Sequence, residues 1–253
     1  MSFSKDVACI IAEYLAEYKL LKWIDVNKLV WDQLSLNPHA IDLLAANLDR
    51  ICWRDLSRNS AAIDLLIANP DKIDWTHLSA NPAAIDLLTA NPDKIHCYYL
   101  SANPAAIDLL KTNIDKIDWR WLSTNPIAID ILKANPDKIN WDVLSKNPAA
   151  IELLKSNPDK IDWRFLSINP AAIDLLKANP DKIYWRWLSK NASINLLTDN
   201  LGKIDWRWLS ANPNAINILK SNPDKIYWLY LSANPAIFEL KINPKLIDKL
   251  LEI

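Results

Sequence analysis

The sequence predicts an all-α fold, a solenoid of about ten copies of a 22-residue repeat. Three observations predict it: a tryptophan that recurs every 22 residues, two Asn-Pro pairs in most repeats, and helical spacing of the apolar residues between those pairs. The composition is typical of a folded chain, since 51% of the 253 residues are hydrophobic and 23% are charged.

The recurring tryptophan defines the register of the repeat. Counted from tryptophan as position 1, the consensus reads W-x-x-L-S-x-N-P-x-A-I-D-L-L-K-A-N-P-D-K-I-D. The step shortens to 21 residues only between Trp185 and Trp206, and Cys97 takes the place of one tryptophan. Copies 1 to 10 begin at Trp31, Trp53, Trp75, Cys97, Trp119, Trp141, Trp163, Trp185, Trp206 and Trp228.

The Asn-Pro pairs predict helix starts, because asparagine is favoured at the N-cap and proline at the first helical position. Asn169-Pro170 and Asn179-Pro180 illustrate the two pairs, and the second asparagine is also expected to end the preceding helix. Between them, Ala172, Ile173, Leu175 and Leu176 fall on one helical face while Asp174 and Lys177 point to water. We therefore expect one regular helix over residues 170–178 and its equivalents.

A second break is expected at position 22. Ile183, Trp185 and Leu188 do not share one face of an unbroken helix, so a new turn should begin at the tryptophan. The aspartates at position 22 could cap that turn, whereas the tyrosine, histidine and cysteine found there in other copies could not cap as well: Asp74, Asp118, Asp162 and Asp205, against Tyr184, Tyr227, His96 and Cys52. Each repeat should thus hold one regular helix and two short helical or 3₁₀ turns.

Such a short unit cannot fold alone, so neighbouring copies must stack, and the ends of the stack should differ from its middle. Residues 1–28 are expected to form an N-terminal capping helix, residues 29–235 the solenoid, and residues 236–253 a C-terminal cap. The copies are expected to pile into one extended rod.

The phrases LSANPAAIDLL and NPDKIDWRWLS resemble short tandem repeats in proteins of giant DNA viruses of amoebae, the Mimivirus and Marseillevirus groups. This resemblance implies a viral protein made in an amoebal host, in the cytoplasm or viral factory, the nucleus or the virion, and it brings no catalytic residues. The segment IIAEYLAEYKLLKWID is similar to an F-box helix, although the Leu-Pro that usually opens an F-box is absent. That second resemblance would imply a ubiquitin-ligase adaptor.

The sequence holds no recognisable motif of catalytic, metal-binding or cofactor-binding residues. Gly202 is the only glycine, which excludes phosphate-cradling loops, and the three histidines have no cysteine or carboxylate at a metal-ligand spacing. Three widely spaced cysteines indicate a reducing, intracellular compartment, and the N-terminal apolar run is too short for a membrane span. We expect a non-enzymatic protein with no metal, no cofactor and no membrane contact.

Positions 2 and 3 of the repeat vary between copies, and they carry the candidate site. Arginine next to an aromatic ring recurs in the later copies, and Arg, Trp and Tyr concentrate binding energy at protein interfaces. The candidate partner-binding residues are Arg120, Trp121, Arg164, Phe165, Arg186, Trp187, Arg207, Trp208 and Tyr230. They predict a scaffold or adaptor for a protein partner.

Two alternatives to this interpretation stay open at this point. If the helix ran unbroken through position 22, the position-3 rings would turn into the core and would bind nothing. Alternating arginine and aromatic rings could also bind single-stranded nucleic acid, although a formal charge of -1, from 29 Lys and Arg against 30 Asp and Glu, argues against it. The sequence does not decide whether two solenoids pair.

Overall fold

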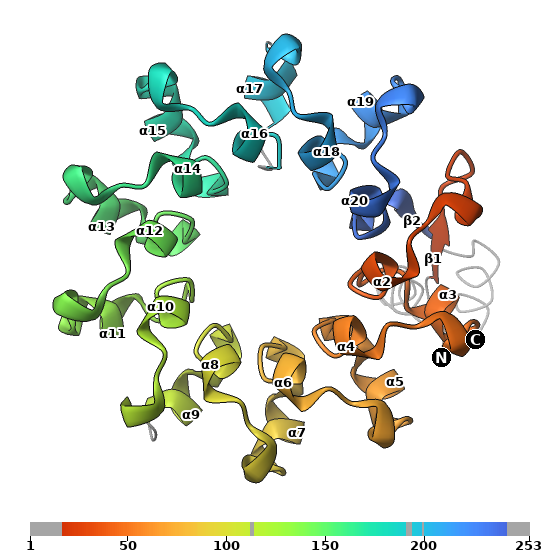
Figure 1. Cartoon of the computed structure of the whole chain (residues 1–253), viewed down its shortest axis with the longest axis horizontal. Coiled ribbons are helices and arrows are strands. Elements are labelled where there is room, and N and C mark those ends of the chain that lie inside the picture. The colour runs from red at the N-terminus through yellow and green to blue at the C-terminus, as the bar shows by residue number, and fades with distance from the viewer. Residues whose placement is uncertain (1–16, 112–113, 191–193, 199, 242–253) are drawn as a thin grey trace, which may run out of the picture.

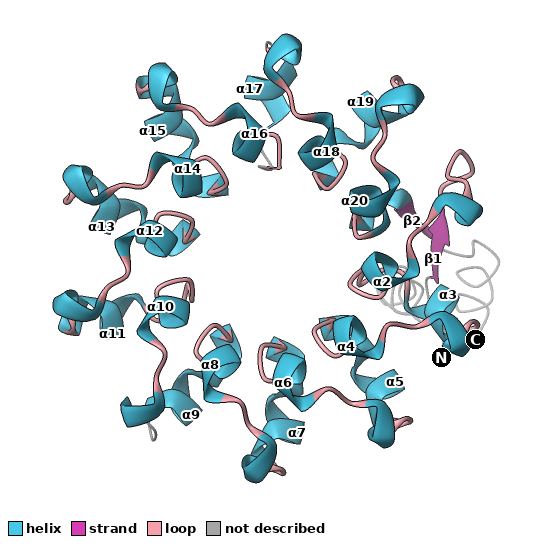
Figure 2. Ribbon diagram, viewed as in Figure 1, coloured by secondary structure: helices cyan, strands magenta, loops and turns pink. Residues whose placement is uncertain are grey.

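A computed structural model describes residues 17–111, 114–190, 194–198 and 200–241, in which the repeats form a closed ring of two layers (Figure 1). The all-helical solenoid expected from the sequence is confirmed, and its copies follow one another around a central opening. Helices account for nearly all regular structure, and the strands are confined to the two ends of the described chain (Figure 2).

The inner layer consists of the short helices that begin at position 1, next to the opening (Figure 1). They are α2 (Trp31–Leu34), α4 (Trp53–Leu56), α6 (Trp75–Leu78), α8 (Cys97–Leu100), α10 (Trp119–Leu122), α12 (Trp141–Leu144), α14 (Trp163–Leu166), α16 (Trp185–Leu188), α18 (Trp206–Leu209) and α20 (Trp228–Ser232). The outer layer consists of α3 (Ile41–Ala45), α5 (Ile63–Ile67), α7 (Ile85–Thr89), α9 (Ile107–Lys111), α11 (Ile129–Ala134), α13 (Ile151–Lys155), α15 (Ile173–Ala178), α17 (Ile194–Thr198) and α19 (Ile216–Lys220).

Short 3₁₀ turns join the two layers. In most copies one turn leads directly into the outer helix: η3 (Ser60–Ala62), η5 (Pro82–Ala84), η7 (Pro104–Ala106), η10 (Pro148–Ala150), η12 (Pro170–Ala172) and η15 (Pro213–Ala215). The equivalent turn in copy 10, η17 (Pro235–Ile237), leads into a strand. The turns that precede the inner helices are η1 (Val26–Lys28), η2 (Leu48–Arg50), η4 (Pro70–Lys72), η6 (Pro92–Lys94), η8 (Ile114–Lys116), η9 (Pro136–Lys138), η11 (Pro158–Lys160), η13 (Pro180–Lys182), η14 (Leu201–Lys203) and η16 (Pro223–Lys225).

The core lies between the layers and is made by the same positions in each copy. In copy 7, Leu166, Ala172 and Leu176 are fully buried, and Ile173 and Leu175 are half-buried. Asp174 and Lys177 are exposed on the outer helix, as the helical spacing predicts. The apolar face of each outer helix is therefore covered by the inner layer, which is the arrangement that removes most apolar surface from water.

The first Asn-Pro pair builds the joint between copies, which we define as the contacts between two consecutive repeats. Asn103 is fully buried, and its Oδ1 accepts a hydrogen bond from the N–H of Ala105 at 3.0 Å, which caps the turn as predicted. Its Nδ2 also donates to the carbonyl oxygens of Ser79 at 3.0 Å and Asn81 at 2.9 Å in the preceding copy. A buried amide needs such partners, so the asparagine at position 7 both caps its own copy and binds the one before.

The serine at position 5 links its own inner helix to the residue directly before the next inner helix. The Oγ of Ser79 donates to the carbonyl of Trp75 at 2.8 Å and accepts from the N–H of His96, at position 22 of the same copy, at 2.9 Å. The buried hydroxyl therefore satisfies a carbonyl of one inner helix and an N–H group at the start of the next.

The second asparagine behaves differently from the prediction. At Asn179 no side-chain hydrogen bond caps the following turn, and Nδ2 instead donates to the carbonyl of Leu175, four residues back, at 2.9 Å. Asn179 thus stands at the N-cap of η13 with Pro180 at its first position, as expected, but its side chain makes no capping bond. Its expected role in ending the preceding helix is confirmed. The amide satisfies a carbonyl that the end of the outer helix leaves unpaired.

The ring closes through a joint that copies the internal ones. Nδ2 of Asn37 in copy 1 donates to the carbonyls of Ser232 and Asn234 in copy 10 at 3.2 and 3.0 Å, and the N–H of Val30 donates to Ser232 Oγ at 2.9 Å. These are the bonds that Asn103, Ser79 and Asn81 illustrate inside the ring. The expected extended rod is therefore wrong, because the last copy binds the first and the ten copies curve through a full turn (Figure 1).

A pair of antiparallel strands reinforces this closure. β1 (Glu17–Leu20) pairs with β2 (Phe238–Lys241), which places Glu17 opposite Lys241 and Lys19 opposite Glu239. Opposite charges across a strand pair are favourable. We use the name seam for the joint between copies 10 and 1 together with these two strands.

The strand β1 also changes the expectation for the N-terminal segment. Glu17–Leu20 lies within the predicted capping helix of residues 1–28 and within the segment similar to an F-box helix, and it is a strand rather than a helix. Of the predicted caps, residues 1–16 and 242–253 lie outside the described residues, and residues 26–28 form the 3₁₀ turn η1. Within the described residues, the first and last segments pair with each other and do not form two separate caps.

Candidate functional site

The inner helices place positions 2 and 3 on the side that faces the central opening. In α14, Leu166 is fully buried against the outer layer and Trp163 is half-buried. Successive residues of a helix are rotated by about 100°, so Arg164 and Phe165 point away from the side of α14 on which Trp163 and Leu166 lie. Since α14 belongs to the inner layer, that direction leads toward the opening (Figure 1).

The predicted aspartate caps fix this orientation. Asp118 accepts a hydrogen bond from the N–H of Trp121 at 2.9 Å, and Asp162 accepts from the N–H groups of Arg164 and Phe165 at 2.8 and 3.1 Å. Asp74 and Asp205 cap their helices in the same way, and Tyr184, Tyr227, His96 and Cys52 make no cap bond. The break at position 22 is confirmed, so the helix does not run unbroken into the tryptophan.

The pKa of Asp162 reflects this capping role. Partial burial alone would raise the pKa, but the hydrogen bonds from the Arg164 side chain and from the N–H groups of Phe165 and Arg164 outweigh it. The pKa of Asp162 therefore lies below its ordinary value, and the carboxylate stays charged at the N-terminus of α14.

The aromatic side chains at position 3 form a ladder along the inner layer. Ring centroids lie 6.2 Å apart between Phe165 and Trp187, 5.4 Å between Trp187 and Trp208, and 5.3 Å between Trp208 and Tyr230. Trp187 and Trp208 are stacked, with 29° between their planes. A second run joins His77, Tyr99 and Trp121 at 5.4 and 6.2 Å.

These rings are half-buried, which answers the question that the sequence left open. They are neither sealed in the core nor free in water, because each ring covers part of its neighbour. The indole N–H groups of Trp121 and Trp208 are buried and have no hydrogen-bond partner among the described residues. The ladder therefore contributes to packing and also leaves ring edges on the inner surface.

The cations gather on one half of the inner surface. Positions 2, 3 and 6 of copies 5 to 9 carry six cations and one anion, Asp142, whereas the same positions of the other five copies carry two of each. The six are Arg120, Lys146, Arg164, Arg186, Lys190 and Arg207. We use the name inner arc for these cations together with Trp121, Phe165, Trp187, Trp208 and Tyr230.

The arginines of the inner arc are exposed, and several are held in place by neighbours. Arg164 forms an ion pair with Asp162 at 2.7 Å, and Arg207 lies 5.1 Å from the ring centroid of Tyr227. Arg186 lies between the Asp205 carboxylate, at 4.0 Å, and the Trp208 ring, at 5.9 Å. Some of the positive charge is thus offset by the capping aspartates, and the remainder faces the opening.

Two lysines that the sequence reasoning overlooked belong to the same surface. Lys146 lies 5.9 Å from the Trp121 ring centroid, and Lys190 lies 5.4 Å from that of Trp208. Burial lowers the pKa of Lys146, and the positive charges of Arg120 and Lys190 lower it further. Both lysines occupy position 6, which varies between copies as positions 2 and 3 do, so the same signal would have found them.

Val143 interrupts the aromatic ladder and leaves a small pocket. It occupies position 3 of copy 6, between Trp121 and Phe165, where the neighbouring copies carry rings. A pocket of about 100 Å³ lies there, lined by Arg120, Trp121, Thr124, Val143, Lys146 and Phe165. It combines two ring edges with two cations, so it suits a side chain that is planar or acidic.

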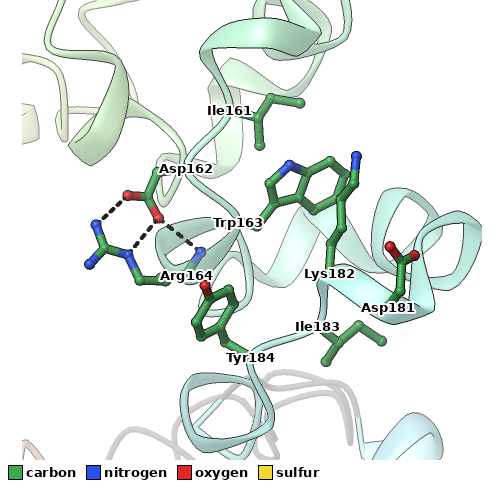
Figure 3. Close-up of a pocket in the computed structure, with 8 residues that line it drawn as sticks. All are labelled: Ile161, Asp162, Trp163, Arg164, Asp181, Lys182, Ile183 and Tyr184. Atoms are coloured by element: carbon green, nitrogen blue, oxygen red, sulfur yellow. Dashed lines mark hydrogen bonds and ion pairs between the residues drawn. The ribbon is translucent and has the colours of Figure 1, made fainter.

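A larger groove of about 530 Å³ is lined by residues of copy 7 and by the last two residues of copy 6 (Figure 3). Asp162 and Arg164 lie on one side of it, and Trp163 with Lys182 lies on the other. Lys182 Nζ is 4.6 Å from the Trp163 ring centroid. The groove therefore separates the arginine of the inner arc from a tryptophan and lysine pair on the neighbouring surface.

No three His, Cys, Asp or Glu side chains within residues 17–111, 114–190, 194–198 and 200–241 come close enough together to hold a metal ion. His77 binds the capping carboxylate of Asp74 at 3.0 Å, which is a structural contact. In the same ranges, no helix has the length and apolar character that crossing a bilayer requires.

Comparisons of the chain with models of known protein families, with curated proteins and with solved structures find no match.

Proposed function

We propose that this chain is a non-enzymatic adaptor that binds a protein partner on the inner arc of the ring. The observation that carries the proposal is the uneven inner surface, on which cations are concentrated in copies 5 to 9 beside half-buried aromatic rings, within a nearly uniform framework. A partner with acidic and aromatic side chains is complementary to this surface. The whole-chain charge of -1 does not oppose it, because the positive charge is local.

A protein fits the ladder better than a single-stranded nucleic acid does. Base stacking needs open ring faces, and the faces of Trp187 and Trp208 already lie against neighbouring rings 5.3 to 5.4 Å away. Ring edges and exposed arginines remain, and these suit carboxylates and aromatic side chains. The pocket at Val143 would take one such side chain between Trp121 and Phe165.

The repeats resemble those of giant-virus proteins, so the partner should be sought in infected amoebae.

The experiment uses charge reversal, because Arg186 and Arg207 are exposed and their replacement should leave the fold intact. The variant Arg186→Glu/Arg207→Glu is compared with Arg54→Glu/Arg58→Glu, which reverses two exposed arginines at positions 2 and 6 of copy 2.

Defined probes separate the two candidate classes. A random copolymer of glutamate and tyrosine should bind the native ring and the copy 2 variant, and binding to the inner-arc variant should fall at least about tenfold. The same ranking should hold for any partner captured from infected cells. If an oligothymidylate binds at physiological salt and the copolymer does not, or if both variants bind the copolymer equally, the proposal is wrong.

A further inference from the structure

The tryptophans at position 1 form a regular series on the ring, and Cys97 is its one interruption. In most copies the lysine at position 20 lies over the tryptophan ring of the same copy, as Lys94 does over Trp75 at 4.5 Å and Lys138 over Trp119 at 4.7 Å. The seam repeats the arrangement with Lys28 over Trp228 at 5.2 Å. Each ring is thus held between apolar neighbours and a cation.

The backbone around Cys97 is the same as in the other copies. The helix α8 has four residues like its equivalents, and Ser101 Oγ donates to the Cys97 carbonyl at 2.9 Å. The joint bonds of Asn103 on one side and of Asn125 on the other are intact. Neighbouring copies therefore keep their spacing, and the volume that an indole occupies elsewhere is not closed by collapse.

A cavity of about 240 Å³ lies at this place. Its lining is mostly apolar and comes from both layers of the ring: Pro92, Ile95, Cys97, Leu100, Leu109, Leu110 and Lys116. An apolar cavity of roughly 150 Å³ in another protein is large enough to bind benzene. Lys116 is the position-20 lysine of copy 4, so the lining includes the counterpart of the cations that cover tryptophan in other copies.

We infer that the Cys97 cavity is a binding site for a small planar aromatic molecule about the size of indole. The nine copies with tryptophan specify the occupant, because the same framework holds an indole ring in each of them. The apolar side chains from copy 4 and the preceding turn would contact the ring faces, and the lysine would favour an electron-rich ring. This site is independent of the inner arc.

Indole itself is the probe, titrated against the full chain by calorimetry and by NMR of the protein. We expect saturable binding of one molecule with a dissociation constant of about 1 mM or tighter, because the site leaves one side of the ring partly open. Cys97→Trp fills the cavity with the residue of the other copies and should reduce the affinity at least about tenfold, while Cys97→Ala should keep it.

Two further variants control for misfolding and for the location of the binding site. Cys97→Phe also fills the cavity, and it replaces the tryptophan variant if circular dichroism shows that the latter is not folded. Val143→Phe fills the pocket on the inner arc and should leave indole binding unchanged. No saturable binding to the native chain, or equal affinity for the native chain and a folded filled variant, would overturn the inference.

The thiol supplies a second readout in a chain with Cys9→Ser and Cys52→Ser. Indole at saturation should slow alkylation of Cys97 by iodoacetamide at least about threefold if the ring covers Sγ. An unchanged alkylation rate at saturating indole places the ligand elsewhere and contradicts the assignment.

Discussion

The internal joint between copies 3 and 4 and the seam between copies 10 and 1 use the same hydrogen bonds over very different sequence distances. At the internal joint, Asn103 binds residues 22 and 24 positions away, whereas at the seam Asn37 binds residues 195 and 197 positions away. Because the same hydrogen bonds form at both places, the sequence of the repeat itself determines closure. The two places differ in the conformational entropy that is lost, because forming the seam also brings together the two ends of the chain.

Closure at the seam has support that internal joints lack. Beyond the strand pair, the Tyr18 ring stacks on His39 with 3.8 Å between centroids, and His39 Nδ1 lies 3.0 Å from the Pro235 carbonyl. A two-stranded ribbon is marginal alone, so these contacts reinforce the joint rather than replace it. The seam therefore combines a standard joint with contacts that offset the greater cost of closing a long loop.

The largest expected effect comes from removing a joint asparagine inside the ring. Asn103→Ala deletes two bonds to the preceding copy and one cap, and it leaves buried groups unpaired, so we expect a loss of about 3 kcal/mol in the free energy of unfolding. Urea denaturation followed by circular dichroism measures it. A loss below about 1 kcal/mol would mean that the asparagine hydrogen bonds at position 7 do not hold the copies together.

The matching change at the seam should act differently. Asn37→Ala removes the same three bonds, but opening the seam leaves a stacked solenoid whose internal joints persist. We expect faster hydrogen exchange in β1, α2, α20 and β2 and a smaller loss of global stability than for Asn103→Ala. Uniform loss of protection around the ring would contradict this distinction.

A medium effect is expected at the side-chain caps of the inner helices, which several internal copies have and α2 at the seam lacks. Asp162→Ala should cost about 1 kcal/mol, and Asp162→Asn should cost less because Asn140 caps α12 in the same way. Val30, the seam counterpart, makes no cap bond, so Val30→Asp should add stability of about 0.5 kcal/mol. Thermal unfolding of the three variants ranks them, and a destabilised Val30→Asp would show that the seam cannot use a cap.

The Asp162 cap also predicts a pH dependence. Because the folded pKa lies below the ordinary value of 3.8, the charged form contributes its stability fully well above that value and loses it as pH falls through the lower, folded pKa. The difference in stability between the native chain and Asp162→Asn should therefore shrink below about pH 4. A difference that stays constant between pH 3 and pH 7 would rule out the charge as its source.

The smallest effect is expected for the lysines that cover tryptophan. Lys94→Met and Lys28→Met remove this contact within copy 3 and at the seam, and each should cost about 0.5 kcal/mol. Equal losses, measured by urea denaturation, would support equivalent packing at both places. A much larger loss for Lys28→Met would indicate that the seam depends on this cation.

The sequence predicted what is local to one repeat. The break before Trp163, the cap by Asp162 and the buried face of Leu176 follow from spacing and capping rules that act over a few residues. The candidate residues at positions 2 and 3 were found because they vary within a constant framework, and the structure brings them onto one surface of the inner layer.

Closure could not be predicted, because it depends on a small rotation between copies that accumulates over the whole chain. No single residue encodes that rotation, which depends on how each whole copy packs against the next. The strand at Glu17–Leu20 was missed for a related reason, since its partner lies more than two hundred residues away. The role of Asn103 in joining copies was missed as well, although the asparagine that recurs at position 7, buried in each copy where that position is described, could have suggested it.

Closure is tested most directly by measuring one distance across the seam and its counterpart inside the ring. Spin labels at positions 32 and 229, in a chain with Cys9, Cys52 and Cys97 replaced by serine, report on position 2 of copies 1 and 10, and labels at positions 32 and 54 report on copies 1 and 2. A closed ring predicts closely similar distance distributions for the two pairs in double electron–electron resonance. A much longer distance across the seam than between copies 1 and 2 would contradict the ring.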